Sequence, residues 1–173
     1  MKIQDEVEVT AEEIVTGPRK PRSTKLKIQI FKVRLVKERV LRFPVTRIGS
    51  SEDLVKIARS ELGHLPHEEI IAIGLSGRNE PVGVVKISQG GIGGAAVTPA
   101  DVIRPLLAMG ALAFVLAHNH PSGDPSPSQD DIAMTKRLKT AADCVNLHFL
   151  DHVIIGGIRG GTGYSSLRDL GIF

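Results

Sequence analysis

The chain has 173 residues, of which 42% are hydrophobic, and this length suits one domain with a hydrophobic core and a modest extension. It contains one cysteine, which excludes an internal disulfide framework and any zinc site built on paired cysteines. The net charge of +3 is unevenly distributed, with −4 on residues 1–13, +10 on residues 18–47 and −3 on residues 48–173.

Residues 1–25 have the composition of a flexible tail, because they show no sustained hydrophobic period and because glycine and proline interrupt their basic stretch. We therefore expect the folded domain to cover residues 26–173. No apolar run approaches the length needed to span a membrane, and no apolar segment follows a basic start as in a signal peptide. A cytoplasmic protein without a membrane partner is expected.

The first predicted elements are a strand, a helix and a hairpin. Apolar and basic residues alternate over residues 26–36, which predicts a strand with a bulge between Ile30 and Phe31, where the alternation slips by one position. A helix is predicted from Ser50 to the stop at Gly63. The predicted hairpin and the loop after it cover residues 69–75 (a buried strand), 82–87 (the return strand) and 90–94 (a glycine-rich loop).

The second half of the chain predicts alternating helices and strands, which favours an α/β domain with tight turns over a helix bundle. Pro105 is expected to kink the first of these helices, since proline removes a hydrogen-bond donor. Cys144 is expected to be a small buried residue. The predicted elements are a helix over residues 99–110, a strand over 111–117, a helix from Ser128 through Leu138, and two strands over 145–150 and 153–155.

A candidate metal site follows the predicted strand 111–117. His118 and His120 are two residues apart, and side chains at positions i and i+2 of an extended chain point to the same side. Asp131 lies in the first turn of the next predicted helix, and a proline-rich loop makes the reversal between them stiff. Two imidazoles and a carboxylate are a ligand set that zinc accepts, and a catalytic zinc keeps its fourth position for water.

Each part of this site also has a simpler explanation. Ser128 and Asp131 have the spacing of a helix capping box, in which the serine is the N-cap and the acid is the third helical residue. The two histidines at a strand end could serve only as surface or hydrogen-bonding residues. It is the combined spacing that favours a metal site.

The string from His118 to Leu138 resembles the motif of the JAMM (MPN or JAB) metallohydrolases, in which His-x-His-Pro, six residues, Ser, two residues and Asp follow an upstream Glu. The residues of this string, together with Leu150-Asp-His-Val-Ile-Ile-Gly156, are most similar to the RadC-like branch of this family. The resemblance implies a mixed, curved sheet flanked by helices, the MPN/JAMM-like (cytidine-deaminase-like) metallohydrolase domain. It also implies a Zn²⁺ ion held by His118, His120 and Asp131.

The family uses a glutamate to activate water, and by resemblance this glutamate opens the first core strand. Glu69 is our choice and Glu68 the alternative, because a one-residue slip moves a strand side chain to the opposite face. Ser128 would donate to the oxyanion, as in related sites, or would serve only as a helix cap. Asp151 and His152 are expected to form a buried, hydrogen-bonded pair, with a supporting role near the metal as the alternative.

The implied function is that of a zinc-dependent metallohydrolase, a peptidase or isopeptidase that acts on a peptide or protein, including ubiquitin-like conjugates. The alternative is a DNA-associated repair or recombination accessory factor or nuclease, with residues 18–47 as the nucleic-acid contact. One departure from the family is Pro99-Ala100-Asp101, where Pro-Arg-Glu is usual. It does not touch the predicted zinc ligands.

Overall fold

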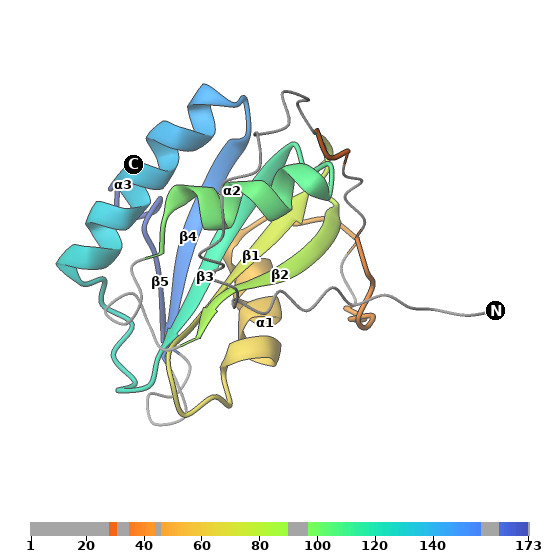
Figure 1. Cartoon of the computed structure of the whole chain (residues 1–173). Helices are drawn as coiled ribbons and strands as arrows, with labels where there is room; N and C mark the ends of the chain where they lie inside the picture. Colours follow the sequence, from red (N-terminus) through yellow and green to blue (C-terminus); the bar gives the residue numbers. More distant parts are fainter. Residues whose placement is uncertain (1–27, 31–34, 44–45, 90–96, 157–162, 173) are drawn as a thin grey trace, which may run out of the picture. The chain divides into compact units, whose positions relative to one another are not determined.

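The computed structural model describes residues 28–30, 35–43, 46–89, 97–156 and 163–172 (Figure 1). The chain divides into two compact units, Met1–Lys32 and Val33–Phe173. In the first unit only residues 28–30 are described, and they form neither helix nor strand. The predicted tail, residues 1–25, and the predicted loop, residues 90–94, lie outside the described residues.

The described part of the second unit contains three helices and five strands. The described strands make one mixed sheet in the order β2-β1-β3-β4-β5, in which β3 and β4 are parallel and the other pairs are antiparallel. This confirms the predicted α/β fold with a mixed sheet flanked by helices. The elements are α1 (Ser51–Leu62), β1 (Glu69–Leu75), β2 (Pro81–Gln89), α2 (Pro99–Ala108), β3 (Ala113–His120), α3 (Gln129–Cys144), β4 (His148–Gly156) and β5 (Tyr164–Ser166).

The helices cover both faces of the sheet, with α1 on one side and α2 and α3 on the other (Figure 1). On the α1 side, Leu54 and Ile57 pack in one buried cluster with Ile71 and Ile73 of β1. The second cluster joins α2 and α3 to the opposite face, with Leu106, Met134, Leu138, Ile70, Ala72 and Leu116 among its members. Both faces of β1 and β3 are therefore buried, which accounts for their uninterrupted apolar sequences.

The strand predicted over residues 26–36 is wrong for the part that the structure describes. Residues 28–30 and 35–36 belong to no strand, and the rest of the segment lies outside the described residues. Leu35 is 60% exposed and Val36 is 91% exposed. An alternating pattern forms a strand only where the segment can pair with another strand and pack its apolar side chains against a core. The described apolar side chains of this segment are exposed, so they make no such packing.

Two boundaries near the C-terminus also differ from the prediction. The strands predicted over 145–150 and 153–155 are one strand, β4, since Asp151 and His152 are buried within it and do not interrupt it. Helix α3 continues past Leu138 to Cys144, which is exposed rather than buried. The sequence pattern was divided at these two polar residues because the partners that satisfy them come from distant segments.

Asp151 joins four segments of the fold through its buried carboxylate. It accepts hydrogen bonds from Ser51 Oγ at the start of α1 (3.2 Å) and Ser166 Oγ in β5 (2.7 Å). It also accepts them from the backbone N–H groups of His152 (2.7 Å) and Arg168 (3.2 Å). The carboxylate thus ties the chain's last turn to the sheet and to α1.

We expect Asp151→Ala to lower the free energy of unfolding by about 3 kcal/mol, because several buried donors would lose a charged acceptor together. Urea denaturation of the two proteins measures this difference. Asp143→Ala is the matched control, since that carboxylate pairs with Lys139 on the exposed surface of α3 and should contribute little. Equal midpoints for the wild type and Asp151→Ala would contradict a structural role for the Asp151 network.

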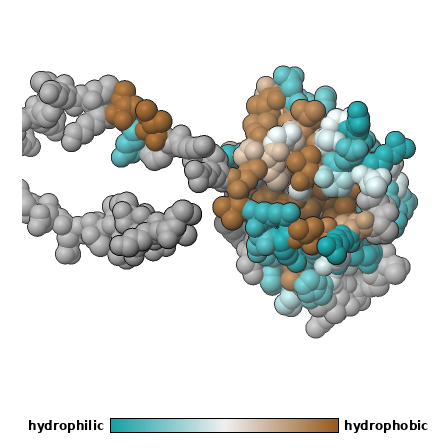
Figure 2. Space-filling view, turned by 90° about the vertical axis from the view of Figure 1, so that its right-hand side faces the viewer, coloured by the Kyte–Doolittle hydropathy of each residue, from teal (hydrophilic) through white to brown (hydrophobic). Residues whose placement is uncertain are grey.

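The surface of the described domain carries several large apolar side chains. Figure 2 shows hydrophobic and hydrophilic residues side by side on one face of the molecule. Val82, Leu107 and Leu112 are 45%, 47% and 57% exposed, and they lie where β2 and β3 begin and α2 ends. Among the described residues, no helix combines the length and apolarity that crossing a bilayer requires.

Candidate metal centre

His118 and His120 lie two residues apart at the end of β3, so their side chains point to the same face of the strand. Position 118 pairs with Ile70 of β1, and it continues the row of Phe114 and Leu116, which face α2 and α3. His118 is fully buried, and His120 is half-buried at the strand end. Their Nε2 atoms lie 3.0 Å apart, so the two rings converge on one point as the spacing predicts.

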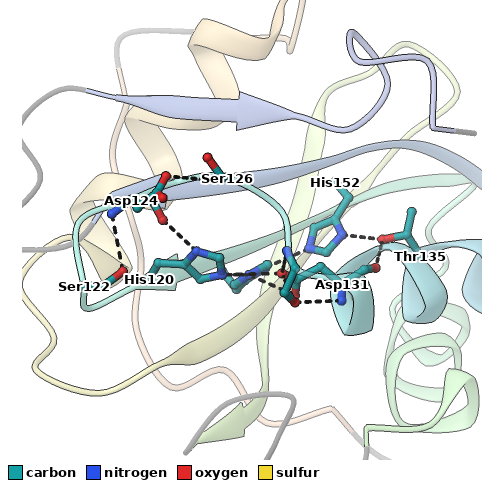
Figure 3. Close-up of polar contacts among 9 residues, drawn as sticks. His120, Ser122, Asp124, Ser126, Asp131, Thr135 and His152 are labelled. Atoms are coloured by element: carbon teal, nitrogen blue, oxygen red, sulfur yellow. Dashed lines mark hydrogen bonds and ion pairs between the residues drawn. The ribbon is translucent and has the colours of Figure 1, made fainter.

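A short loop brings the chain from His120 to the start of α3. Its Gly123 has a φ of 95°, a conformation that favours glycine, and the Gly123 N–H donates to the His120 carbonyl over 3.0 Å. The Asp124 carbonyl accepts from His120 Nδ1 at 2.8 Å, which holds this ring against the loop (Figure 3). The loop also packs on β4, because a side chain at Gly156 would come within 2.6 Å of the Gly123 carbonyl.

Asp131 is both a helix cap and a neighbour of the histidines. Its Oδ2 accepts from the Ser128 N–H (2.8 Å) and from Ser128 Oγ (2.6 Å), and its own N–H donates to Ser128 Oγ (3.1 Å). The predicted capping box is thereby confirmed. The other carboxylate oxygen, Oδ1, lies 3.3 Å from His118 Nε2. The capping role therefore leaves Asp131 Oδ1 facing the imidazoles.

The surroundings set the charge states of the three side chains. Burial lowers the pKa of His118 to about 4, so this imidazole is neutral at neutral pH. The hydrogen bond with Asp131 raises the pKa of His120. Burial acts to raise the pKa of Asp131, but hydrogen bonds from His120 and Ser128 and the attraction of His118 outweigh it, so the pKa lies well below its usual range. Asp131 is therefore ionised, as a metal ligand must be.

Glu68 completes the group. One ligand atom from each of Glu68, His118, His120 and Asp131 lies within 4.8 Å of the others. Continuing the β1–β3 register from Ile70 and His118 by two residues sets Glu68 level with His120, on the face that meets α3. The structure thus brings together the three residues predicted as ligands and adds the glutamate that was the alternative base.

Glu69, the residue chosen as the base from sequence, lies on the other face of β1. Its buried Oε2 is 2.8 Å from Lys86 Nζ and 3.5 Å from His67 Nε2. The choice between Glu68 and Glu69 depends on which face of β1 meets α3. Because every residue of β1 is buried, its sequence has no polar alternation that could reveal this face.

Asn119, between the two histidines, holds the backbone on both sides of Glu68. Its Oδ1 accepts from the Glu69 N–H and its Nδ2 donates to the His67 carbonyl, each over 2.9 Å. The side chain is fully buried on the face opposite to the histidines. It was not predicted as a functional residue, since a lone asparagine between two histidines gives no sign of its partners.

We expect Asn119→Ala to lower the free energy of unfolding by about 2 kcal/mol, because it removes both partners from buried backbone groups. Urea denaturation monitored by circular dichroism measures the change. An unchanged denaturation midpoint would show that the hydrogen bonds of Asn119 to the backbone of His67 and Glu69 do not stabilise the fold.

His152 and Thr135 lie behind His118 and are fully buried. His152 Nε2 is 2.8 Å from His118 Nδ1, and His152 Nδ1 is 2.6 Å from Thr135 Oγ1 (Figure 3). Burial lowers the pKa of His152 well below its ordinary value. Asp151 and His152, expected as a hydrogen-bonded pair, bond through the His152 N–H and the Asp151 carboxylate, while their side chains serve different networks. Thr135 was not predicted, although its four-residue spacing from Asp131 on a helix places both on one face.

The donor atoms fit a zinc ion. Ligands held about 2.0–2.2 Å from a tetrahedral zinc lie roughly 3.3–3.6 Å from one another. Here His118 Nε2 is 3.3 Å from Asp131 Oδ1, within this range, and 3.0 Å from His120 Nε2, somewhat shorter than it. His120 Nε2 is 3.5 Å from Asp131 Oδ2, the oxygen that also caps α3. Two imidazole nitrogens and a carboxylate oxygen also match the ligand chemistry of zinc.

Comparison with known proteins identifies the family to which the chain belongs. Residues 48–172 match the RadC-like JAB domain family. A "UPF0758 protein" of Flavobacterium johnsoniae is 40% identical over 127 residues, which are 73% of this chain and 54% of that protein. Proteins of the same name from Carboxydothermus hydrogenoformans (38% over 105 residues, 61% and 46%) and Desulfitobacterium hafniense (36% over 125 residues, 72% and 53%) are also similar. The chain spans about half the length of the curated relatives it matches.

Proposed function

Because this chain belongs to the RadC-like JAB domain family, we propose that it is a zinc-dependent hydrolase of amide bonds in peptide or protein substrates, including ubiquitin-like conjugates. The observation that carries the proposal is the convergence of Glu68, His118, His120 and Asp131 within 4.8 Å. Three of these side chains suffice as ligands of a catalytic zinc, and the fourth is a carboxylate within reach of a water molecule.

The ligands would be His118 Nε2, His120 Nε2 and Asp131 Oδ1. When bound, zinc supplies a Lewis acid that polarises a carbonyl and lowers the pKa of a water molecule. The protein's part is to keep this ligand set in place before the ion arrives. The strand fixes the histidines, and the cap at Ser128 fixes the Asp131 rotamer through Oδ2.

Glu68 would move the proton. In amide hydrolysis a water proton must be removed during attack and then delivered to the leaving nitrogen, and one carboxylate can perform both steps. Glu68 immediately precedes β1 and is partly exposed, so its carboxylate is close to the ligand group and accessible to solvent. Ser128 is a second candidate, as an oxyanion donor, because it is an exposed residue beside Asp131; its hydroxyl donates to Asp131 in this structure.

A parallel screen tests the proposal. Zinc-loaded protein is incubated with peptide, isopeptide-linked and nucleic-acid substrates, with chelator-treated protein as the control. We expect amide cleavage that chelation abolishes and added zinc restores. Zinc-dependent cleavage of nucleic acid without amide cleavage would overturn the proposal and favour the nuclease alternative.

A nucleic-acid contact through residues 18–47 stays a prediction from the sequence. Of the basic residues in this segment that the structure describes, Arg39 forms an ion pair with Glu61 of α1. This pair gives one basic side chain a partner within the chain. A phosphate-binding role for the segment would require binding that weakens steeply with added salt.

A further inference from the structure

We propose that His152 and Thr135 are positioning residues that fix the ring tautomer of His118 and so keep its Nε2 lone pair directed at the ligand group. The inference rests on the proposed zinc site but concerns two side chains outside it. Neither His152 nor Thr135 is placed as a ligand, because both ring nitrogens of His152 face His118 and Thr135, and the Thr135 hydroxyl contacts His152 and the Asp131 carbonyl. Their effect would be transmitted through hydrogen bonds alone.

Three contacts form one chain. His118 Nδ1 meets His152 Nε2 at 2.8 Å, His152 Nδ1 meets Thr135 Oγ1 at 2.6 Å, and Thr135 Oγ1 donates to the Asp131 carbonyl at 2.7 Å. Figure 3 shows His152 and Thr135 pointing toward each other, with Thr135 on α3 beyond Asp131. The chain therefore begins on one proposed ligand and ends on the backbone of another.

The order of donors in this chain can be derived from its Thr135 end. A hydroxyl has one hydrogen, and a backbone carbonyl can only accept, so the Thr135 hydrogen is used on Asp131. Toward His152, Thr135 Oγ1 must then accept, which places a proton on His152 Nδ1. A neutral imidazole has one N–H, so His152 Nε2 accepts from His118 Nδ1–H. His118 Nε2 is left with a lone pair.

The same order follows independently from the site. A metal ligand needs its lone pair on Nε2, and its other ring nitrogen then donates to an acceptor. For His120 this acceptor is the Asp124 carbonyl, which can only accept from His120 Nδ1. The partner of His118 Nδ1 is instead another histidine, whose ring can donate or accept until Thr135 orients it.

The opposite order would place the proton where it blocks the site. If Thr135 donated to His152 Nδ1, then His152 Nε2–H would donate to His118 Nδ1, and the His118 proton would sit on Nε2. Because all three side chains are fully buried, water does not compete for these bonds. The Asp131 carboxylate, with Oδ1 3.3 Å from His118 Nε2, would accept that Nε2 proton, so the i−4 bond of Thr135 to the Asp131 carbonyl is the contact that opposes this second order.

Thr135→Val in the full-length chain tests the inference, because valine has the shape of threonine without the hydroxyl. Thr135→Ser restores the hydroxyl, and Thr140→Val is the matched control. Thr140 lies on the same helix and makes the same i−4 bond, to the Lys136 carbonyl (3.1 Å), but it is exposed and far along the helix from the histidines. The two readouts are the zinc dissociation constant by chelator competition and the histidine tautomers by two-bond ¹H–¹⁵N spectra of metal-free protein.

We expect the wild type to show His118 protonated at Nδ1. Thr135→Val should give a mixture of His118 tautomers and raise the zinc dissociation constant about 10- to 100-fold, the range found when outer partners of metal ligands are removed. Thr135→Ser should restore both values, and Thr140→Val should change neither. A role in packing alone would leave the tautomer unchanged in Thr135→Val.

The two proposals fail in different ways. Unchanged tautomers and unchanged zinc affinity in Thr135→Val would overturn the positioning role while the zinc site stands. A wild type that binds no zinc would overturn the proposed function, and the spectra of the metal-free proteins would still decide whether Thr135 orders the two histidines.

Discussion

The Asp131→Ala protein should lose tight zinc binding, with a dissociation constant raised by more than about 100-fold, because removal of a ligand costs more than the 10- to 100-fold loss expected from an outer partner. The change removes the only anion among the three proposed ligands and leaves two imidazoles. Metal content after dialysis and chelator competition measure the effect. Amide hydrolysis should disappear together with the zinc.

The second capping box of this fold provides the control for Asp131→Ala. Thr98 and Asp101 at the start of α2 repeat the same bonds, since Asp101 Oδ2 accepts from the Thr98 N–H (2.9 Å) and from Thr98 Oγ1 (2.6 Å). Loss of the cap on α3 itself should cost about 1 kcal/mol of stability. Asp101→Ala should weaken its own helix start and leave zinc binding intact. Equal zinc content in both variants and the wild type would show that Asp131 is a cap and nothing more.

The Glu68→Gln protein should bind zinc normally and hydrolyse its substrate about 100- to 10,000-fold more slowly, the range that a general base contributes. Glutamine keeps the size of the side chain and removes its ability to accept a proton. Zinc content and kcat of the same preparation separate the two effects. Loss of zinc in Glu68→Gln would instead make Glu68 a fourth ligand, since its carboxylate belongs to the same close group.

Glu69→Gln is the control one residue away, and it also tests the base predicted from sequence. Glu69 contacts Lys86 and His67 on the opposite side of β1, so its replacement should leave kcat nearly unchanged. An inactive Glu69→Gln beside an active Glu68→Gln would restore Glu69 as the base. The pair of variants therefore decides between two adjacent residues that sequence could not separate.

Local patterns in the sequence predicted most elements of the domain correctly. The helix after Ser50, the hairpin of β1 and β2, and the strand that leads to His118 all follow from hydrophobic runs bounded by turn residues. The failures share one cause. The segment 26–36 alternates without burial in its described part, and β4 continues through Asp151 and His152 because distant residues satisfy them. Long-range partners decide such cases, and a local pattern does not contain them.

The residues of the candidate site also differ in whether a local pattern could predict them. The spacing of His118, His120 and Asp131 could be interpreted from sequence because all three lie within one strand, loop and helix start. Glu68 and Asn119 depend on the register between β1 and β3, which are separated by a strand and a helix along the chain. Thr135 and His152 depend on the packing of α3 against β4. These contacts become visible only when the sheet is assembled.

The double use of Asp131 limits how the loop before α3 can change over time. Surface loops usually tolerate insertions and deletions better than the elements they connect. Here one added or removed residue between His120 and Ser128 would shift the start of α3 relative to the end of β3, and the cap and the ligand set would be lost together. Because Gly123 packs closely against Gly156 at the end of β4, the loop has no space to accommodate the change. Substitutions in this loop should therefore disturb the fold and the site less than changes in its length. The ten residues between His120 and Asp131 fix the position of the start of α3 relative to the end of β3.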